Sequence, residues 1–289
     1  MGAVSKPAEQ IEIALLLEAI YQRYQYDFRG YSLGSVTRRL VQAQHHFGCR
    51  SLSMLQEKVL HEPAMLPKLL DFLTIQVSEM FRDPSFFRTL REKVVPHLKT
   101  YPSLKVWVAG CGEGEELYSL AILFREEGIE DRTIFYATEL NPTALKKAEA
   151  GIYALDRIAL FTENHRNSGG RSSLSDYYTA AYGAAVFDKT LRSRAVFAQH
   201  NLVADHVFAE VQLVSCRNVL IYFNRDLQDR AIGLFKDALV RGGFLGLGAR
   251  ESLRFSRHAD SFADFAPTER IYRRTASLAA DMELGHGLA

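Results

Sequence analysis

The stretch KVWVAGCGEGEELYSLA, Lys105 to Ala121, decides the fold. It begins with an apolar run, Val106 to Ala109, that is typical of a strand covered on both faces. Three glycines follow at alternate positions from Gly110, and residues without Cβ let a backbone turn sharply and approach a ligand closely. Glu115 and Glu116 then open a predicted helix with apolar residues at helical spacing. The stretch therefore predicts a strand, a glycine turn and a helix.

The glycine turn favours one class of ligand. A dinucleotide fingerprint, G-x-G-x-x-G, counted from Gly110 through Gly112, requires a third glycine where this chain has Glu115. Carboxylates at a helix start repel a phosphate that the helix dipole would otherwise attract. The turn therefore suits a cofactor with positive charge and no phosphate, such as S-adenosylmethionine (SAM). The alternative is that Glu115 and Glu116 are ordinary first-turn acids favoured by the dipole.

Composition narrows the class of protein. The chain has 289 residues, 47% of them hydrophobic and 24% charged, with a net charge of +1, so it carries no polycationic signal for nucleic acid. Its N-terminal apolar patch is interrupted by Glu12 and Glu18, which argues against a signal peptide or membrane insertion. Three distant cysteines, Cys49, Cys111 and Cys216, indicate a reducing compartment without a disulfide framework or Cys-rich metal site. We therefore expect a cytoplasmic protein without a metal ion, and a monomer.

The first part of the chain, up to about residue 79, is predicted to be helical. Apolar residues recur at helical spacing from Ile11, and Gly30 marks the first break. Further helices are predicted from Ser32 or Ser35 to Gly48, over 52–61 with Ser51 as the cap, and from Pro63 to Val77.

The second of these helices has two predicted faces. Its apolar stripe consists of Val36, Leu40, Ala43 and Phe47, and Arg38 and Arg39 are assigned to the other side. Such a side is ordinarily a solvated face. Because few acids lie near Arg38 and Arg39, the more specific hypothesis is that this side of the helix binds an acidic partner.

A polar and aromatic stretch, residues 74–87, precedes the predicted sheet. Asp83 is expected to cap a helix that begins at Pro84. The capping role of Asp83 does not explain Arg82. A purely structural explanation for Arg82 would be an ion pair with Asp83 or Glu79.

From residue 105, strands alternate with helices, which predicts a mainly parallel sheet with helices on both faces. Strands are predicted at 105–109, 133–138, 195–199, 211–215 and 244–248, with a closing hairpin near 262–272 and helices over 142–150 and 226–240. Residues 151–195 break this alternation, and we expect loops and short antiparallel strands there, lying over the carboxyl edge of the sheet.

Polar residues follow the predicted strands at their carboxyl ends, the edge where open α/β sheets bind ligands. They are Glu116, Glu139, Asn201, Arg217 and Asn218. Glu139 is placed to accept hydrogen bonds from ribose hydroxyls, and the alternative is a residue of the helix N-cap before Asn141 and Pro142.

Five stretches in this order, EMFRDPSFF, AGCGEGEELYSLA, YATELN, FAQHNL and CRNVLIYF, together resemble the CheR family of chemoreceptor glutamate methyltransferases. The match covers roughly residues 10–275. The resemblance implies a helical N-terminal domain (1–79), a linker that contributes to the cofactor site (80–104) and a tail (277–289). Between them it implies a Rossmann-like class I methyltransferase domain (105–276) with a mainly parallel seven-stranded sheet and a small antiparallel β-subdomain inserted near 165–195.

The resemblance also implies methyl transfer from SAM to a receptor glutamate, giving a γ-glutamyl methyl ester and S-adenosylhomocysteine. It also implies which residues contact the cofactor. Gln76, Ser78 and Arg82 would line it from the linker side, Glu116 would hold the methionine ammonium and Glu139 the ribose. The adenine would be bordered by Asn201 and Leu202, and the methionine part by Arg217 and Asn218. Arg82 and Tyr222 would lie nearest the methyl group, although Tyr222 also suits a core position between Ile221 and Phe223. The helix with Arg38 and Arg39 would meet the receptor helices.

Four positions depart from the family pattern, namely Gln76 for Asn, Ser78 for Thr, Glu139 for Asp and Glu113 for a smaller polar residue. Gln76 and Glu139 are each one methylene longer than the usual residue, so the departures bear on cofactor affinity rather than on fold. They keep open a SAM-binding module without turnover. A methyltransferase for another protein carboxylate, a small acid or RNA is the other alternative, and the low net charge weighs against RNA.

Overall fold

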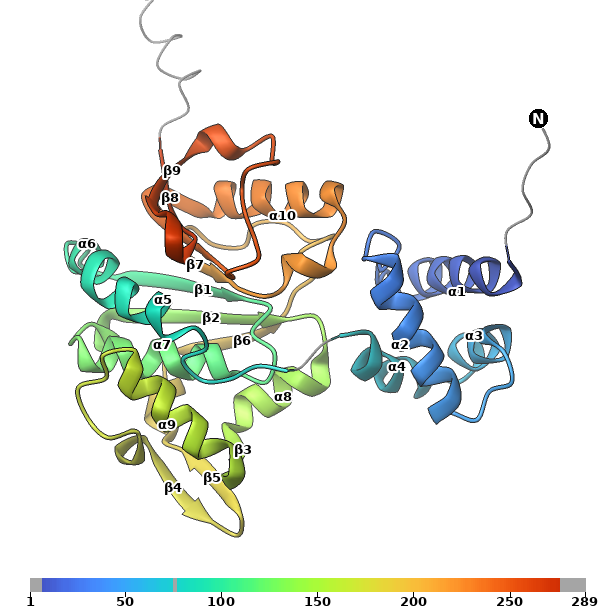
Figure 1. Cartoon of the computed structure of the whole chain (residues 1–289), viewed down its shortest axis with the longest axis horizontal. Coiled ribbons are helices and arrows are strands. Elements are labelled where there is room, and N and C mark those ends of the chain that lie inside the picture. Colours follow the sequence, from blue (N-terminus) through green and yellow to red (C-terminus); the bar gives the residue numbers. More distant parts are fainter. Residues whose placement is uncertain (1–6, 75–76, 276–289) are drawn as a thin grey trace, which may run out of the picture. The chain divides into compact units, whose positions relative to one another are not determined.

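The computed structural model describes residues 7–74 and 77–275, which fall into two compact units (Figure 1). The helical unit takes the described residues up to Thr74 together with the segment Tyr222–Leu227, and the larger unit takes Val77–Ile221 and the described residues from Gln228 onward. A short segment far along the sequence therefore belongs to the helical unit.

The helical unit consists of four helices that follow the predicted pattern. They are α1 (Ala8–Tyr24), α2 (Leu33–His46), α3 (Leu52–His61) and α4 (Met65–Leu73). Ser51 caps α3 by accepting a hydrogen bond from the Met54 N–H at 3.2 Å, and Gly48 follows α2 with a φ of +65°. The prediction for α4 was wrong at both ends, because the helix begins after Pro63 and stops at Leu73, and Val77 lies outside it with 77% of its surface exposed.

A seven-stranded sheet forms the centre of the larger unit, in the order β6-β2-β1-β7-β8-β10-β9 (Figure 1). Its strands are β1 (Leu104–Ala109), β2 (Thr133–Glu139), β6 (Ala195–Gln199), β7 (Val211–Cys216), β8 (Leu239–Leu247), β9 (Phe262–Ala266) and β10 (Ile271–Arg274). The first five strands in this order pair in parallel, and β10 runs antiparallel to β8 and β9. The predicted mainly parallel α/β sheet with a closing hairpin is confirmed.

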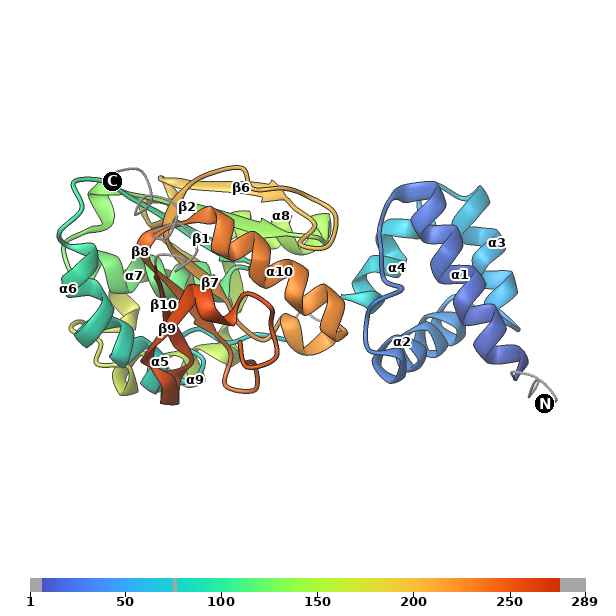
Figure 2. The same cartoon turned by 90° about the horizontal axis from the view of Figure 1, so that it is seen from above.

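Helices cover both faces of this sheet. They include α5 (Pro84–Thr89), a π-helical turn (Leu90–Val94), α6 (Val95–Leu98), α7 (Glu115–Glu126), α8 (Pro142–Ala150) and α10 (Arg225–Ala238). Phe124 of α7 packs on Phe135, and Phe135 is in register with Val106, whereas Phe235 of α10 packs on Trp107, the next residue along β1. Because successive strand residues point to opposite faces, α7 and α10 lie on opposite sides of the sheet, as Figures 1 and 2 show.

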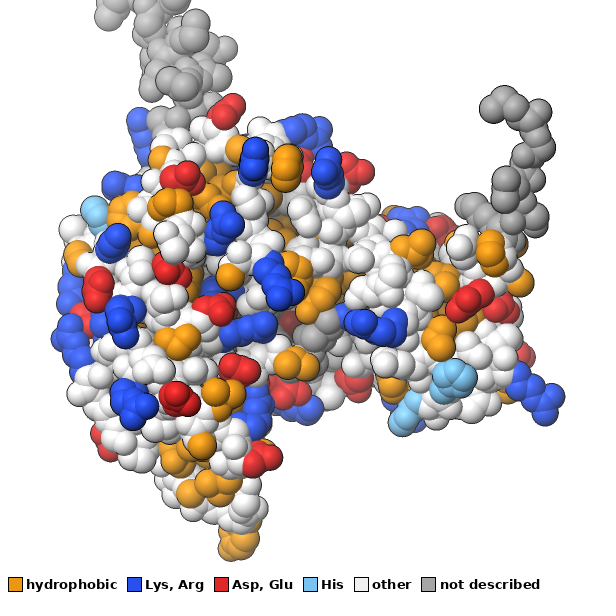
Figure 3. Space-filling model, viewed as in Figure 1, with side chains coloured by type: hydrophobic (Ala, Val, Ile, Leu, Met, Phe, Trp, Pro, Cys, Tyr) orange, Lys and Arg blue, Asp and Glu red, His pale blue; other side chains and the backbone are white. Residues whose placement is uncertain are grey.

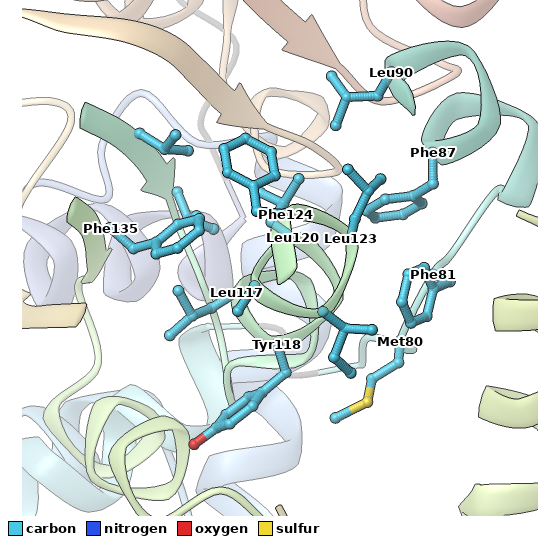
Figure 4. Close-up of a cluster of buried hydrophobic side chains, with 14 of the residues drawn as sticks. Met80, Phe81, Phe87, Leu90, Leu117, Tyr118, Leu120, Leu123, Phe124 and Phe135 are labelled. Carbon is cyan, nitrogen blue, oxygen red and sulfur yellow. The ribbon is translucent and has the colours of Figure 1, made fainter. Parts of the chain in front are cut away.

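The core of the larger unit is built around α7, whose residues from Leu117 to Phe124 are all buried. Figure 4 shows this helix surrounded by aromatic and aliphatic side chains from before and after it in the chain, among them Met80, Phe81, Phe87 and Phe135. Residues 80–104 are therefore part of the same core as the sheet.

A second, three-stranded antiparallel sheet forms the insert, in the order β3-β5-β4 (Figure 1). Its strands are β3 (Ile152–Ala154), β4 (Tyr178–Ala181) and β5 (Ala184–Phe187), with the helix α9 (Ile158–Asn167) between β3 and β4. The insert begins within the range 151–195 that was predicted to break the alternation, and before the residue 165 that the resemblance implies. The helix α9 was not predicted, although Ile158, Phe161 and His165 are buried at helical spacing. Hydrophobic side chains gather at the tip of the insert in Figure 3, where Tyr182 is fully exposed in the turn between β4 and β5.

Candidate functional site

The glycine turn after β1 has the conformation that its sequence predicts. Gly110, Gly112 and Gly114 have φ values of +71°, +58° and +96°, in the left-handed region that favours glycine. The N–H groups of Gly110 and Cys111 both donate to the carbonyl of Thr138, so the turn is joined to the end of β2. A Cβ on Gly110 would lie 2.6 Å from the Val219 side chain, so this glycine also allows a close approach of the chain after β7.

Glu139 closes the turn from the side of β2. Its Oε2 accepts a hydrogen bond from the Gly112 N–H at 3.0 Å, and its Oε1 accepts from the N–H groups of Leu140 and Asn141. The N-cap of α8 is Asn141, whose Oδ1 accepts from the Thr143 and Ala144 N–H groups. Glu139 is therefore fixed by backbone donors beside the glycine turn, and Asn141, not Glu139, caps α8.

Carboxylates surround the turn. Burial raises the pKa of the Cys111 thiol well above its usual value, and the negative charges of Glu139, Glu115 and Glu116 raise it further. Three acidic side chains therefore lie close to the turn, and such a setting suits a cofactor with ammonium and sulfonium groups better than a phosphate. Cys216 is buried as well, with a raised pKa, so both thiols are packing residues.

Arg217, which follows β7, is the centre of the site. Its side chain is 1% exposed, and its guanidinium donates to Glu116 at 3.2 Å and to Asp83 at 2.8 Å. The Nη2 atom also donates to the backbone carbonyl of Arg82 at 2.8 Å. A buried guanidinium is costly unless its donors are satisfied, and here both Nη atoms have acceptors, whereas Nε has none among the described residues. Arg217 therefore ties the start of α7 to the segment before α5.

The remaining contacts of this cluster complete its geometry. Ser215 donates a hydrogen bond to Glu116, and the ring of Phe86 lies under the guanidinium of Arg217, 4.1 Å from its central carbon. Asp83 precedes α5 as predicted, but no side-chain capping bond forms there, because its carboxylate pairs with Arg217.

Backbone strain gathers at the same place. Of the six non-glycine residues with positive φ among those described, three lie here, namely Phe81 (+53°), Asp83 (+56°) and Asn218 (+61°). Such conformations cost roughly 1–3 kcal/mol each and concentrate at functional sites. This clustering supports a functional site around Arg217.

A second arginine, which no sequence pattern singled out, joins the insert to the segment just before the linker. Arg157 donates to Glu115 at 2.9 Å and to the carbonyl of Ser78, and Glu115 is completely buried at the start of α7. Burial raises the pKa of Glu115, while a backbone hydrogen bond and Arg157 oppose the rise. The sequence indicated that Glu115 lies in the first turn of a helix, but it did not indicate its partner Arg157, which lies 42 residues away in the chain.

The predicted adenine-side residues follow β6. Asn201 accepts a hydrogen bond from the Val203 N–H through its side chain and donates one to Asp205 from its backbone, and Leu202 is buried. They share the carboxyl edge with Glu139, since β6 pairs with β2 and Glu139 lies opposite Gln199.

Arg82 is half-buried, and its side chain donates to the carbonyl of Val77 at 3.4 Å. The structural alternative for Arg82 was an ion pair with Asp83 or Glu79. The Asp83 carboxylate pairs with Arg217 instead. Gln76 lies outside the described residues.

Arg39 requires a correction. It was predicted to lie with Arg38 on an exposed basic face, but Arg39 is 6% exposed and donates to the carbonyl of Leu73. It lies three residues after Val36 and four before Ala43, so helical spacing puts it on the buried stripe. Arg38 is exposed. Arg39 is therefore a structural residue of the helical unit and not part of a docking face.

Tyr222 belongs to the helical unit as well. Its carbonyl accepts a hydrogen bond from the Ser32 N–H at 2.8 Å, and the Asn224 N–H donates to the carbonyl of Gly30 at 2.7 Å. The segment Tyr222–Leu227 is therefore held to the loop before α2. A position for Tyr222 beside the methyl group stays a prediction.

Neither a metal-binding group nor a membrane-spanning helix is found among the described residues. Residues 7–74 and 77–275 hold no group of three or more His, Cys, Asp or Glu side chains that is suited to a metal ion. Within the same ranges, no helix is both long enough and apolar enough to cross a bilayer.

Comparisons with known proteins agree with this geometry. Residues 76–270 match the family model described as "CheR methyltransferase, SAM binding domain", and residues 11–74 match "CheR methyltransferase, all-alpha domain". A Pseudomonas putida protein named "Putative methyltransferase Cher3" is 55% identical over 92% of this chain and 97% of its own length. A "Chemotaxis protein methyltransferase" of Listeria innocua is 34% identical over 65% of this chain and 70% of its own.

The likeness to solved structures is weaker. The glycopeptide N-methyltransferase MtfA, solved with S-adenosylhomocysteine, is 12% identical, with a TM-score of 0.35. The match covers 60% of this chain and 50% of the MtfA chain. A score of this size has no bearing on activity.

Proposed function

Because this chain belongs to the CheR methyltransferase family, we propose that it methylates glutamate side chains of chemotaxis receptors, giving γ-glutamyl methyl esters. The chain is a SAM-dependent methyltransferase, and SAM is its cofactor. The named chemotaxis methyltransferases among its relatives support the receptor as the substrate. The glutamate as the acceptor rests on the family resemblance.

The chemistry suits a site without a general base. A glutamate carboxylate is already ionised near neutral pH and needs no deprotonation to act as a nucleophile. SAM, when bound, supplies an activated methyl group. The work of the protein is then to hold the two reactants in line and to accommodate the loss of charge as they react.

The observation that carries the proposal is the Arg217 cluster. One buried guanidinium contacts Glu116, our candidate for the methionine ammonium, and also the backbone of Arg82, our candidate for orienting the receptor carboxylate. The side chain of Arg82 is half-buried and makes one weak hydrogen bond among the described residues, to Val77, so its guanidinium is available to an incoming carboxylate in fork geometry.

The other proposed roles keep to the positions that match the family. Gly110, Gly112 and Ser78 would face the cofactor, Glu139 would accept the ribose hydroxyls, and the remaining contacts would come from Gln76, Asn201, Leu202, Arg217 and Asn218. Tyr222 would act near the methyl group. Arg38 stays as the receptor-facing cation of α2, with Arg39 removed from that role.

A direct test is transfer of the tritiated methyl group of SAM to receptor-containing membranes from the same cell. We expect radiolabel on a receptor that is released as methanol by mild base, the property of a carboxyl methyl ester. SAM binding by calorimetry without transfer to any receptor would favour a binding module. Base-labile label on a different protein would keep the methyltransferase and replace the substrate.

A further inference from the structure

A buried carboxylate lies behind the site, and the chemistry proposed above does not use it. Glu251 follows β8 and is 4% exposed. Its Oε2 accepts hydrogen bonds from the N–H groups of Gly248 at 2.6 Å and Asn218 at 3.0 Å, and its Oε1 accepts from the Ile221 N–H at 3.2 Å. A buried carboxylate costs several kcal/mol unless donors satisfy it, and here backbone donors do so.

These donors come from two separate segments. Gly248 follows β8, whereas Asn218 and Ile221 lie in the loop after β7, 33 and 30 residues before Glu251 in the chain. The two strands pair in parallel with Cys216 opposite Leu247, so both segments leave the carboxyl edge side by side. Glu251 therefore bridges two neighbouring loops at the edge where the proposed cofactor residues lie.

The bridge leaves little freedom to the loop that it holds. Asn218 has a left-handed φ of +61° without being glycine, a conformation that needs support from its surroundings. The Glu251 carboxylate supplies that support at the Asn218 N–H. A Cβ on Gly248 would lie 2.8 Å from both the Asn218 nitrogen and Glu251 Oε2, so the bridge is also tightly packed.

A local turn alone does not account for this arrangement. The Glu251 N–H donates to the Gly248 carbonyl at 2.9 Å, which already closes the turn after β8. The two hydrogen bonds to Asn218 and Ile221 reach outside that turn, into the loop that carries Arg217 and Asn218.

We propose that Glu251 is a positioning residue of the cofactor site, whose carboxylate fixes the loop from Asn218 to Ile221 so that Asn218 can meet the methionine part of SAM. The inference deepens the proposed function and rests only on its cofactor contacts. It does not depend on which carboxylate receives the methyl group.

The test measures SAM affinity by calorimetry together with thermal stability. Glu251→Gln keeps the shape and one acceptor oxygen but turns an amide NH₂ toward backbone N–H groups, and we expect SAM to bind about tenfold more weakly. The matched control is Asp229→Asn, because Asp229 is also buried but accepts its hydrogen bonds from Ser256 and Arg257, neither of which is a proposed cofactor residue. We expect the control to lower the Tm while SAM affinity stays at the wild-type value.

A second variant keeps the test decisive if Glu251→Gln does not fold. Gly248→Ala retains the carboxylate but places a methyl group against Asn218, and it should weaken SAM binding in the same way. Wild-type SAM affinity in a folded Glu251→Gln or Gly248→Ala protein would overturn the proposal, as would an equal loss of affinity in Asp229→Asn. A wild-type protein that binds SAM but esterifies no receptor would instead count against the proposed substrate alone.

Discussion

The guanidinium of Arg39 lies over the ring of Tyr222, with its central carbon 5.1 Å from the ring centroid. The same guanidinium donates to the carbonyl of Leu73, the last residue of α4. Arg39 therefore contacts both the segment proposed to carry a residue of the reaction and the end of the helical unit that leads into the linker. Burial lowers the pKa of Arg39, and the nearby Tyr222 opposes that shift.

The first prediction concerns the two adjacent arginines of α2. Replacing Arg39 with alanine removes the donor to Leu73 and the cation over Tyr222, so we expect the unfolding free energy to fall by about 1–3 kcal/mol. Arg38→Ala is the matched control, because Arg38 is exposed, and it should change stability by less than about 0.5 kcal/mol. Urea unfolding followed by far-UV circular dichroism measures both, and equal midpoints for the two variants would contradict the buried role.

The second prediction addresses the receptor surface. Arg38→Glu reverses an exposed charge on α2, so receptor methylation should fall several-fold while SAM affinity and Tm stay unchanged. Raising the salt concentration should reduce the difference between variant and wild type, since an exposed charge pair is screened. Lys68→Glu, on the exposed side of α4, is the control for net charge. A loss of methylation equal to that of Lys68→Glu would remove Arg38 from the docking surface.

Local sequence patterns were sufficient for most of the fold. The glycine turn, the alternation of strands and helices and the closing hairpin each follow from residues close together in the chain. The insert helix α9 was missed because its surroundings are rich in glycine, serine and tyrosine, although its buried residues Ile158, Phe161 and His165 keep a helical spacing.

The candidate site was predictable in its location but not in its internal contacts. The carboxyl ends of parallel strands meet at one edge, so Glu139 and Arg217 were expected there. The partner of Arg217 is Asp83, 134 residues away in the chain, and such a pairing depends on tertiary packing that no spacing rule encodes. Arg39 is the opposite case, because its spacing from Val36 and Ala43 was visible and its charge was given too much weight.

The third prediction separates catalysis from structure in the segment before α5. Arg82→Ala should reduce turnover by at least about 100-fold and change stability by less than about 1 kcal/mol, since among the described residues its side chain makes one long hydrogen bond, to Val77. Arg217→Ala should instead destabilise the protein by roughly 3–5 kcal/mol, because it leaves the buried cluster without its cation. Single-turnover methylation with saturating SAM and thermal unfolding distinguish the two. Near-normal turnover in Arg82→Ala would exclude Arg82 from the reaction.

The last prediction concerns acid stability and rests on the carboxyl end of α7. Glu126 accepts hydrogen bonds from Arg91 at 2.6 Å and from His165 at 3.0 Å, and its side chain is 2% exposed. Burial raises the pKa of Glu126, but these two partners outweigh it and bring the pKa down to about 2.

Because the folded-state pKa of Glu126 lies below its ordinary value of 4.5, the stabilisation is complete above that pH and is lost as the pH falls toward about 2. Glu126→Gln should therefore lower the unfolding free energy by about 3 kcal/mol at pH 7, and the gap to wild type should narrow steadily between pH 4.5 and 2. Urea unfolding at pH 7, 5, 4 and 3 measures the gap, with Glu163→Gln on the exposed side of α9 as the control. A gap that stays constant across this range would mean that the carboxylate charge of Glu126 adds nothing to stability, and that the side chain serves only to fill space between Arg91 and His165.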